Sequence, residues 1–416
     1  MAKANKSALG FIFITLVIDI TGWGIIIPVM PKLMQQLTGK PLTEVATIGG
    51  LMLFAYSAMQ FLFSPILGGL SDKYGRRPII LLSLAGFAAD YLFQALAPSI
   101  GWLFVGRLLA GVTGASITTA SAYIADVSTP EKRAQNFGLI GAAFGIGFVL
   151  GPLIGGLCSQ LGTRAPFYVA AGLTLLNFLY GYFVLPESLS KENRRAFDWK
   201  RANPIGSLKQ LRKYPVVTGL SIALTLLYIA AHAVQSNWSF YTMYKFGWTE
   251  TMVGISLAVV GLLVGAVQGG LIRYLVPKIG QTKAVYAGLL LYLVGMILFS
   301  VASAGWMMFV FLVPYCLGGI SGPSMQGIMS NAVPPNEQGE LQGALTSLMS
   351  LTSIIGPLIM TNLFSYFSSN KAPIYLPGAP FYAGALFLLV GFAMAYKTLS
   401  RHAMAETIPV DEIGGK

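Results

Sequence analysis

Long unbroken apolar runs limit how this chain can fold more than any other feature. Each run is about 20 residues long, the length that a helix needs to cross about 30 Å of hydrocarbon. A membrane barrel would instead show segments of about 10 residues in which apolar and polar residues alternate. The runs therefore predict an all-α membrane protein with twelve transmembrane helices. We place the spans at residues 8–31, 45–70, 78–97, 100–124, 136–160, 165–185, 215–237, 250–275, 283–303, 305–330, 340–365 and 379–398.

The composition excludes several other classes. Charged residues are 10% of the 416 residues, against about 25% in soluble domains, which is too little charge to cover a water-facing surface. This excludes a soluble enzyme, a disordered chain and a nucleic-acid-binding domain, so we expect no nucleic acid partner. Cys158 and Cys316 lie inside apolar runs, which favours packing roles over a disulfide framework or a metal site. The run from Ala8 is too long for the core of a signal peptide, so it is expected to be the first span.

The basic residues predict the orientation. With both termini on one side, 21 of the 27 Lys and Arg residues fall in or near the loops of that side, five fall on the other, and Arg107 falls inside a span. Loops rich in Lys and Arg face the cytoplasm. The net charge of +12 is thus mostly a topology signal. We expect a multi-pass protein of the cell (inner) membrane with both termini in the cytoplasm.

An internal repeat predicts the domain organisation. Residues 126–138 align with 331–343 at an offset of 205, and residues 151–152 align with 356–357 at the same offset. Two repeated six-helix halves, pseudo-symmetric around a central cavity, are typical of secondary transporters. The basic linker between them is expected to lie against membrane lipid. We divide the chain into 1–185 as the N-terminal half, 186–214 as the cytoplasmic linker, 215–400 as the C-terminal half and 401–416 as a cytoplasmic tail.

Charged side chains inside the spans are costly and usually functional. Asp19 lies about halfway along the first span, with no basic residue near it in the sequence. A carboxyl group removed from water holds a proton more readily than one in water. One interpretation is a site for a proton or another cation. The other is a structural acid that is hydrogen-bonded to backbone or hydroxyl groups.

Asp90 and Arg107 flank the turn between the third and fourth spans. Each lies about eight residues from the turn at Pro98-Ser99, which is about 12 Å along a helix at 1.5 Å per residue. An antiparallel hairpin would bring them to the same depth, where they could pair. The pair would be either a static salt bridge that orients two helices or a switchable one that breaks when Asp90 takes up a proton.

Polar and aromatic residues indicate a candidate substrate cavity. His232 is either a hydrogen-bonded packing or cavity residue or a proton-coupling group, since histidine titrates near neutral pH. Intramembrane amides either line a polar cavity or hold helices together. The candidate cavity residues are Trp23, His232, Gln235, Asn237, Trp238 and Gln326.

The fifth span contains a dense glycine pattern. Glycines spaced in this way permit close helix packing, and a proline removes a backbone hydrogen bond and promotes a bend. The alternatives are plain packing and a kink in a moving helix, of which we favour the kink. The residues of the pattern are Gly147, Gly151, Pro152, Gly155 and Gly156.

The loop between the second and third spans reads GGLSDKYGRRP over residues 68–78. An Asp beside three basic residues at a helix–helix turn can form a charge network that locks the inner face shut. Positive-inside anchoring alone would explain the Arg pair but not the Gly and Asp spacing. The candidate gate residues in this loop are Gly68, Asp72, Gly75, Arg76 and Arg77.

These motifs together resemble those of the major facilitator superfamily. GGLSDKYGRRP resembles its loop 2–3 signature, LFVGRLLAGVTGA around Arg107 resembles its helix-4 signature, and the pattern in the fifth span resembles its antiporter motif. DITGWGIIIPVMP and DYLFQALAPSIGWLFVGRLLAGVTGAS are similar to segments of tetracycline/proton antiporters, in the drug:H⁺ antiporter branch. The likeness covers essentially the whole chain. It implies a monomer with a small organic substrate, no cofactor, and the proton as coupling ion.

The resemblance also implies roles for individual residues. Arg107 would support a proton pathway in which Asp19 and Asp90 are essential membrane acids. Asp126 and Arg133 would join the cytoplasmic gate with the loop at 68–78.

This chain departs from the tetracycline exporters at two positions. Those proteins have an acid in the ninth span, where our alignment puts Tyr292, and a histidine in the eighth span, where it puts Val264. The second-half loop, GGLIRYLVPKIG, keeps its glycines and Arg273 but lacks the Asp. We therefore expect proton coupling to depend on the N-terminal half.

The favoured function is secondary active transport, in which amphipathic organic compounds such as tetracycline-like drugs leave the cell in exchange for protons by alternating access. The alternative on the same fold is a metabolite uptake symporter or uniporter, because a fold fixes neither substrate nor direction. A membrane sensor without transport is a third hypothesis. The sequence does not predict an enzyme, because we find no nucleophile constellation, metal cluster or phosphate loop in it.

Overall fold

The computed structural model describes residues 2–114, 116–128, 130–197, 213–334 and 337–407. Across these residues the backbone forms helices joined by short connections, and it contains no strand. The all-α prediction is therefore confirmed. The helices are long, as expected where the backbone must satisfy its own polar groups in a bilayer.

Twelve helical segments of the described residues are long and apolar enough to cross a membrane. The first is Ala8–Ile26 and the last is Ala379–Arg401. They correspond one to one with the twelve expected spans, although individual ends differ by several residues. This confirms the predicted number of spans and makes the chain a multi-pass membrane protein.

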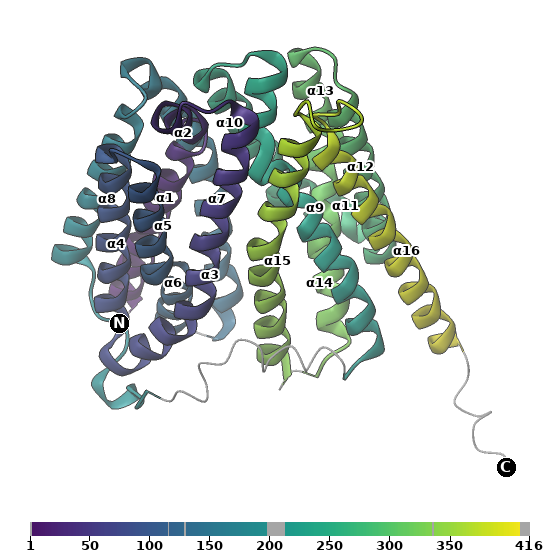
Figure 1. The fold of residues 1–416 in the computed structure, drawn as a ribbon. Helices are drawn as coiled ribbons and strands as arrows, with labels where there is room; N and C mark the ends of the chain where they lie inside the picture. Colours follow the sequence, from purple (N-terminus) through teal and green to yellow (C-terminus); the bar gives the residue numbers. More distant parts are fainter. Residues whose placement is uncertain (1, 115, 129, 198–212, 335–336, 408–416) are drawn as a thin grey trace. The chain divides into compact units, whose positions relative to one another are not determined.

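Figure 1 labels most of these helices along the chain. Short 3₁₀ helices are η1 (Ser159–Leu161), η2 (Lys191–Asn193) and η5 (Gly318–Ile320), and η4 (Val267–Leu271) is a π-helix. The α-helices are α1 (Ala2–Ile26), α2 (Met30–Thr38), α3 (Leu42–Tyr74), α4 (Arg76–Leu96), α5 (Ile100–Thr113), α6 (Ser116–Val127), α7 (Pro130–Cys158), α8 (Ala165–Val184), α9 (Pro215–Phe246), α10 (Glu250–Ala266), α11 (Ile272–Ile279), α12 (Gln281–Val301), α13 (Gly305–Leu317), α14 (Ser321–Asn331), α15 (Gln338–Phe367) and α16 (Ala379–Thr407).

Three spans that the sequence predicts as single α-helices are not regular α-helices throughout, and the fourth has a non-helical residue at Gly114. The fourth consists of α5 and α6, the eighth of α10, η4 and α11, and the tenth of α13, η5 and α14. The short helix α2 was also not expected. It is amphipathic and buries Leu33 and Met34, so it gives no long apolar run. Hydropathy predicts the presence of a span but not a break within it.

Contacts divide the chain into two compact units. The first contains Met1–Pro204, Ser236–Gly265 and Pro357–Pro377, and the second contains the remainder. The first unit thus combines the first six spans with parts of α9, α10 and α15. The division into halves at 1–185 and 215–400 was based on the sequence repeat and stays a prediction.

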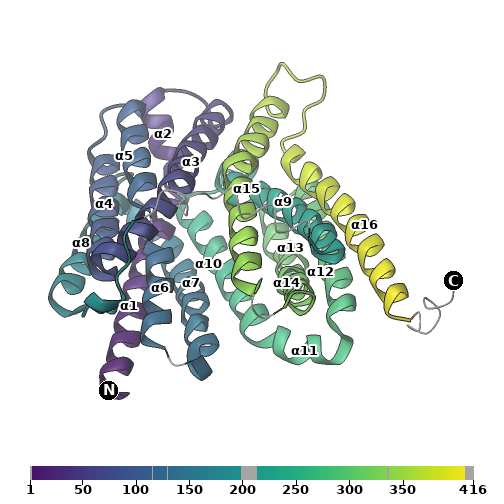
Figure 2. The same ribbon diagram turned by 90° about the horizontal axis from the view of Figure 1, so that it is seen from below.

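Within the first unit, α1 packs against α7 and α8, while α4 packs against α5 and α8. Figure 2 shows α1 between α7 and α8. An apolar core that includes Ile12, Leu16, Leu84 and Ile124 joins α1, α4 and α6. This core fixes the helices that bear Asp19, Asp90 and the hydroxyl groups around them.

A single residue joins α3 to α4. Gly75 has a φ angle of +108°, a backbone conformation that residues other than glycine rarely adopt. Its N–H donates to the Ser71 carbonyl at 3.0 Å and closes the last turn of α3. Because α4 begins at the next residue, the charged side chains on both sides of Gly75 are held close together.

Candidate functional site

Asp90 and Arg107 form a buried ion pair. Asp90 in α4 is fully buried and Arg107 in α5 is 5% exposed. Arg107 Nη2 forms an ion pair with Asp90 Oδ2, and Arg107 Nε donates to Asp90 Oδ1 at 3.3 Å. Gly106 makes room for the carboxylate, because a Cβ at that position would lie 2.6 Å from Asp90 Oδ1. The α4–α5 hairpin thus pairs the two charged residues that the sequence predicts at the same depth in the membrane.

Two further side chains surround this pair. Gln94 donates from Nε2 to Asp90 Oδ2 at 2.9 Å. The ring of Tyr56 in α3 lies 5.6 Å from the guanidinium carbon of Arg107, within the range of a cation–π contact. Leaving one member of a buried ion pair uncompensated costs about 3–5 kcal/mol. A proton that reaches Asp90 therefore changes the energy of Arg107 strongly.

Asp19 in α1 has hydroxyl neighbours. It is 6% exposed, and Ser116 Oγ donates to its Oδ2 at 2.6 Å. The hydroxyl groups of Tyr56 and Tyr91 interact with it electrostatically. Among the described residues, no Lys or Arg forms an ion pair with Asp19. Because a hydroxyl can donate or accept, Ser116 can remain bonded to Asp19 in either protonation state.

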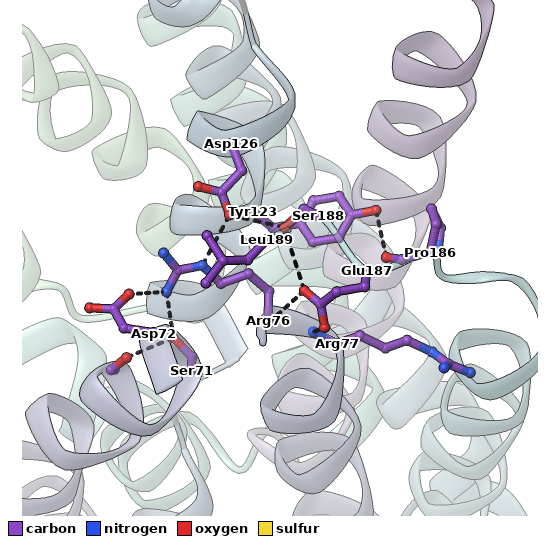
Figure 3. Close-up of polar contacts among 11 residues, drawn as sticks. Ser71, Asp72, Arg76, Arg77, Tyr123, Asp126, Pro186, Glu187, Ser188 and Leu189 are labelled. Atoms are coloured by element: carbon purple, nitrogen blue, oxygen red, sulfur yellow. Dashed lines mark hydrogen bonds and ion pairs between the residues drawn. The ribbon is translucent and has the colours of Figure 1, made fainter. Parts of the chain in front are cut away.

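Arg76 is the centre of a charge network at the turn between α3 and α4 (Figure 3). Its Nη1 lies 2.5 Å from Asp72 Oδ1 and 2.7 Å from Ser71 Oγ. Its Nε lies 3.0 Å from Asp126 Oδ2 at the end of α6. One guanidinium group thus joins α3, α4 and α6, which is the fork geometry that arginine provides for carboxylates. Of the residues expected in the gate, Asp72, Arg76 and Asp126 are in direct contact.

Glu187, which the sequence analysis did not select, accepts hydrogen bonds from the start of α4 (Figure 3). Its Oε1 lies 2.8 Å from the backbone nitrogen of Arg76, and its Oε2 lies 3.3 Å from that of Arg77. The first N–H groups of a helix have no partner within the helix and favour negative charge. A Cβ on Gly75 would collide with this carboxylate. Both the positive φ angle and the nearby Glu187 carboxylate therefore favour glycine at position 75.

The residues around Glu187 attach the start of the linker to the gate. Ser188 Oγ donates to Asp126 Oδ2 at 3.0 Å, and Tyr123 Oη donates to the Pro186 carbonyl at 3.1 Å. Arg77 Nη2 donates to the Tyr182 carbonyl at 2.5 Å. The end of α8 and the first linker residues are thus held by α4 and α6.

Further along, the linker crosses the end of α3. The N–H of Arg195 donates to the Asp72 carbonyl at 3.1 Å. A Cβ on Gly69 would lie 2.8 Å from the Phe197 ring, so the ring packs on this part of α3. A polar cavity of about 530 Å³ lies between the gate and the linker. Its lining residues are Asp72, Arg76, Asp126, Leu189, Glu192, Asn193, Arg194 and Arg195.

Two other expected gate residues differ from these. The Gly68 carbonyl joins the network as acceptor of a hydrogen bond from Ser71 Oγ at 2.7 Å. Gly68 lies in α3, and a Cβ there would have nothing within 4 Å. The side chain of Arg133 lies outside the described residues. The contacts therefore give Gly68 no packing role, and the expectation for Arg133 stays a prediction.

The glycines of α7 pack closely on α1. A Cβ on Gly147 would lie 2.8 Å from the Cβ of Ile20, and one on Gly151 would lie 2.6 Å from the Thr21 carbonyl oxygen. A Cβ on Gly155 would collide with the backbone of Ile25. The described structure therefore shows the packing role directly. The helix α7 continues through Pro152, and a kink that serves motion stays a prediction.

The same stretch of α7 also contacts the start of α10 within the same unit. Thr251 Oγ1 donates to the Gly156 carbonyl at 2.8 Å. A Cβ on Gly156 would lie 2.9 Å from the Thr251 Cα, and one on Gly254 would collide with the Pro152 carbonyl. The glycine pattern therefore allows α7 to touch α1 and α10 at once.

Comparisons with known proteins agree with this architecture. A sequence model of the Major Facilitator Superfamily matches residues 12–357 and 237–414. The chain belongs to the major facilitator superfamily. Membership makes it a membrane transporter and not an enzyme. The resemblance inferred from the motifs is confirmed.

Curated relatives in this superfamily include drug-resistance proteins. The class C tetracycline resistance protein of Escherichia coli is 37% identical over 91% of this chain and 95% of its own length. The class E protein of Escherichia coli is 37% identical over 94% of this chain and 95% of its own length. Multidrug resistance protein 2 of Bacillus subtilis (strain 168) is 29% identical over 82% of this chain and 85% of its own length.

Solved structures share the fold at low identity. The human organic anion transporter MFSD10 (TETRAN) has a TM-score of 0.70 and 23% identity, over 94% of this chain and 99% of that one. A bacterial homologue of the human lysosomal transporter Spinster, in an inward-facing and occupied conformation, has a TM-score of 0.73 and 16% identity, over 94% of this chain and 96% of that one. These two matches support the superfamily fold alone.

Within this transporter, the candidate cavity residues of the first unit differ in exposure. The ring of Trp23 packs edge-on against Phe148 with centroids 5.6 Å apart. Trp238 is 2% exposed and donates from Nε1 to Ser256 Oγ at 2.8 Å, and Asn237 is fully buried. The buried positions of Trp238 and Asn237 favour packing roles for both.

The other three candidate cavity residues belong to the second unit. A Cβ on Gly356 would lie 2.6 Å from Cγ of His232, so the imidazole packs directly on α15. Gln326 donates from Nε2 to Tyr228 Oη at 3.2 Å, and Gln235 is exposed. That all six residues line one substrate cavity stays a prediction.

Proposed function

We propose that this protein is a secondary active antiporter that exports amphipathic organic compounds, tetracycline-like drugs among them, in exchange for protons. The observation that supports this most is the burial of Asp19 and of the Asp90–Arg107 pair within one compact unit. Ionisable groups at membrane depth are expensive and are typical of ion pathways. The relatives named tetracycline resistance proteins support the compound class.

In the proposed cycle, Asp90 acts as a switch. When Asp90 is ionised, it neutralises Arg107 and holds α4 against α5. A proton on Asp90 removes that attraction and leaves the guanidinium uncompensated at depth, an unfavourable state that rearrangement relieves. Asp19 is the second proton site, held by Ser116 rather than by a cation. Protons that enter down their gradient would thereby drive the exchange of access.

The charged turn at Arg76 is the proposed cytoplasmic gate. Its ionic bonds hold α3, α4 and α6 together at one end of the first unit. We place this end in the cytoplasm of a cell (inner) membrane, with both termini on the same side, because most basic loop residues then face inward. The proton serves as coupling ion, no cofactor is required, and the functional form is a monomer.

The second candidate function is uptake of a metabolite by symport or uniport. The observation that favours it is Tyr292, which stands where our alignment puts the ninth-span acid of the tetracycline exporters. Its ring packs edge-on against Tyr315, with centroids 5.0 Å apart. A phenol can form hydrogen bonds but is uncharged at neutral pH. A neutral substrate would suit this position better than a cationic one.

Proton flux in energised inside-out vesicles tests the proposal. Vesicles with the wild-type protein receive a panel of amphipathic drugs that includes Mg²⁺-tetracycline, with Asp90→Asn vesicles in parallel. We expect a drug-triggered proton leak that is lost in the variant. A leak that persists in both Asp90→Asn and Asp19→Asn would contradict proton coupling through these acids. Inward, gradient-driven accumulation of a metabolite in whole cells, with no drug response, would support uptake instead.

A further inference from the structure

The fourth span is interrupted between the two acid sites. Its first helix, α5, ends at Thr113, and its second helix, α6, begins at Ser116. Gly114 lies between them with φ −72° and ψ +50°, outside helical geometry. A helix end leaves carbonyl groups without helical partners, and inside a bilayer those groups need other donors. The structure must therefore supply a donor from another span at this point.

Gln60 in α3 supplies that donor. Its Nε2 donates to the Gly114 carbonyl at 2.9 Å and also to the Tyr56 hydroxyl at 3.2 Å. A primary amide has two N–H groups, so one side chain can make both bonds at once. A Cβ on Gly111 would lie 2.6 Å from the Tyr56 carbonyl oxygen. The two helices are thus in direct backbone contact beside the break.

Each side of the break leads to one of the acids. On the α6 side, Ser116 is the first described residue of the helix and donates to Asp19 at 2.6 Å. On the α3 side, the ring of Tyr56 lies against the Arg107 guanidinium, which pairs with Asp90. Contacts with Asp19 thus lie on one side of the break and contacts with the Asp90–Arg107 pair on the other, and Gln60 bonds both to the Gly114 carbonyl at the break and to Tyr56.

We propose that Gln60 is a positioning residue that couples the protonation of Asp19 to the Asp90–Arg107 pair through the break in the fourth span. When Asp19 gains a proton, the hydrogen bond from Ser116 no longer ends on a charged acceptor, so it becomes longer and weaker. The start of α6 and the Gly114 carbonyl move with Ser116. Gln60 follows the carbonyl and shifts the Tyr56 ring beneath Arg107.

Few other titratable groups surround the two acids. Those in range are Tyr56 from α3, Tyr91 from α4 and Arg107 from α5. The helices α7 and α8 contain no Asp, Glu, Lys, Arg or His in residues 136–158 and 165–184. The titratable neighbours of the two acids thus lie in α3, α4 and the fourth span.

The test measures the protonation of Asp90 directly. The full-length protein is labelled with [4-¹³C]aspartate, reconstituted in lipid nanodiscs and titrated by NMR, and the signals are assigned with single Asp→Asn variants. We expect Asp19→Asn, which makes position 19 permanently neutral, to shift the titration midpoint of Asp90 by about one pH unit, a coupling of about 1.4 kcal/mol. In a Gln60→Leu background the same substitution is expected to shift it by less than about 0.3 units.

Ser64→Ala is the matched control. Ser64 lies one turn along α3, and its Oγ is 3.5 Å from Thr118 Oγ1 in α6, so it joins the same spans without touching the break. We expect the Asp19-dependent shift to remain in this variant. Gln60→Met, which keeps the chain length without the donors, serves as a second variant if Gln60→Leu is poorly folded. The proposal would be overturned if the Asp19-dependent shift of the Asp90 midpoint persisted in either Gln60 variant. It would also be overturned if the protein with the natural Gln60 showed no such shift.

The coupling rests on the proposed proton role of the two acids, but its measurement needs no transported drug. If the Asp90 midpoint depends on Asp19 through Gln60 but drugs drive no proton flux, the coupling is supported and drug export is rejected. Intact flux with independent titrations would reject the coupling and leave export standing.

Discussion

Two turns of this transporter have similar backbone conformations, but the side chains around them differ in charge. Gly75 joins α3 to α4 with φ +108°, and Gly280 joins α11 to α12 with φ +83°. The N–H of Gly75 donates to the Ser71 carbonyl at 3.0 Å, and that of Gly280 donates to the Val276 carbonyl at 2.9 Å. The two donors, Gly75 and Gly280, are 205 residues apart, and so are the two acceptors, Ser71 and Val276. This is the offset of the internal repeat.

The side chains on these two backbones differ in charge. The gate residues Asp72, Arg76 and Asp126 correspond at this offset to Pro277, Gln281 and Asn331. The buried ion pair is also absent from the second half: Asp90 corresponds to Gly295 at this offset, and Arg107 corresponds to Tyr315 when Gly111, Gly114 and Ser116 are aligned with Gly319, Gly322 and Ser324. The two turns therefore share their helix-joining geometry, while these charged side chains occur in the first copy and uncharged residues stand in their place in the second. The following predictions test how far that separation holds.

The largest effect is expected from breaking the buried ion pair. Asp90→Asn leaves Arg107 uncompensated, so we expect a loss of about 3–5 kcal/mol in unfolding free energy and loss of drug-driven proton flux. Adding Arg107→Leu, which removes the uncompensated charge, should restore most of the stability but none of the flux. Denaturant unfolding in detergent and flux in inside-out vesicles measure the two effects. Flux that returns with the double variant would show that the charges serve packing alone.

Exchanging the gate chemistry should have the next largest effect. Arg76→Gln gives the first turn the residue of the second and removes the bonds to Asp72 and Asp126. We expect about tenfold slower transport and faster thiol labelling of a cysteine placed at Ser188, because the gate no longer holds the linker. The reverse change, Gln281→Arg, should slow transport much less and should lower stability by about 1–3 kcal/mol, the cost of an unmatched polar group. Equal transport defects in the two variants would remove the functional distinction between the turns.

Gly75→Ala and Gly280→Ala separate backbone strain from crowding. Both residues have positive φ, so each alanine should cost about 1–3 kcal/mol. Only Gly75 faces the Glu187 carboxylate, whereas a Cβ on Gly280 would have nothing within 4 Å. Gly75→Ala should therefore be the more destabilising, and Glu187→Ala should reduce that excess. Unfolding free energies of the three variants provide the measurement, and equal losses at both glycines would argue against the contact with Glu187.

The smallest effect is expected at Gly68. A Cβ there meets nothing within 4 Å, and alanine is favoured over glycine inside a helix by about 0.5–1 kcal/mol. Gly68→Ala should therefore leave transport unchanged and raise thermal stability slightly. Gly69→Ala, by contrast, should displace Phe197 and lower stability. A transport defect in Gly68→Ala at normal expression would show that this glycine acts in motion rather than in the described packing.

The sequence predicted features that depend on local pattern. Run length gave the twelve spans, because crossing hydrocarbon requires a fixed number of helical residues. Residue counting from a hairpin turn gave the shared depth of Asp90 and Arg107, since helical rise is constant. The charge pattern around Arg76 also predicted a network, although which partners it contacts required coordinates.

Features that depend on distant partners were missed. Glu187 lies 111 residues after Arg76, and nothing in the local sequence distinguishes a helix-capping glutamate from a loop charge. In the sequence, nothing distinguishes Gln60 from other helical residues. Its role depends on the Gly114 carbonyl, which accepts its hydrogen bond at the break. The break itself lies within an apolar run, so hydropathy does not detect it. The glycines at 111 and 114 were the available signal, and the sequence analysis used them only for the resemblance to the helix-4 signature.

The attachment of residues 186–197 has a consequence for dividing the chain. A first fragment that stops at residue 185 would lack Glu187, Ser188 and Phe197, and with them the groups that hold α4, α6 and α3 from outside the bundle. A fragment that extends through residue 197 would keep all three. When the two halves are produced from separate genes, the position of the cut within this short stretch should therefore decide whether the first half keeps its gate assembled. The segment that joins the halves along the chain is also a component of one of them.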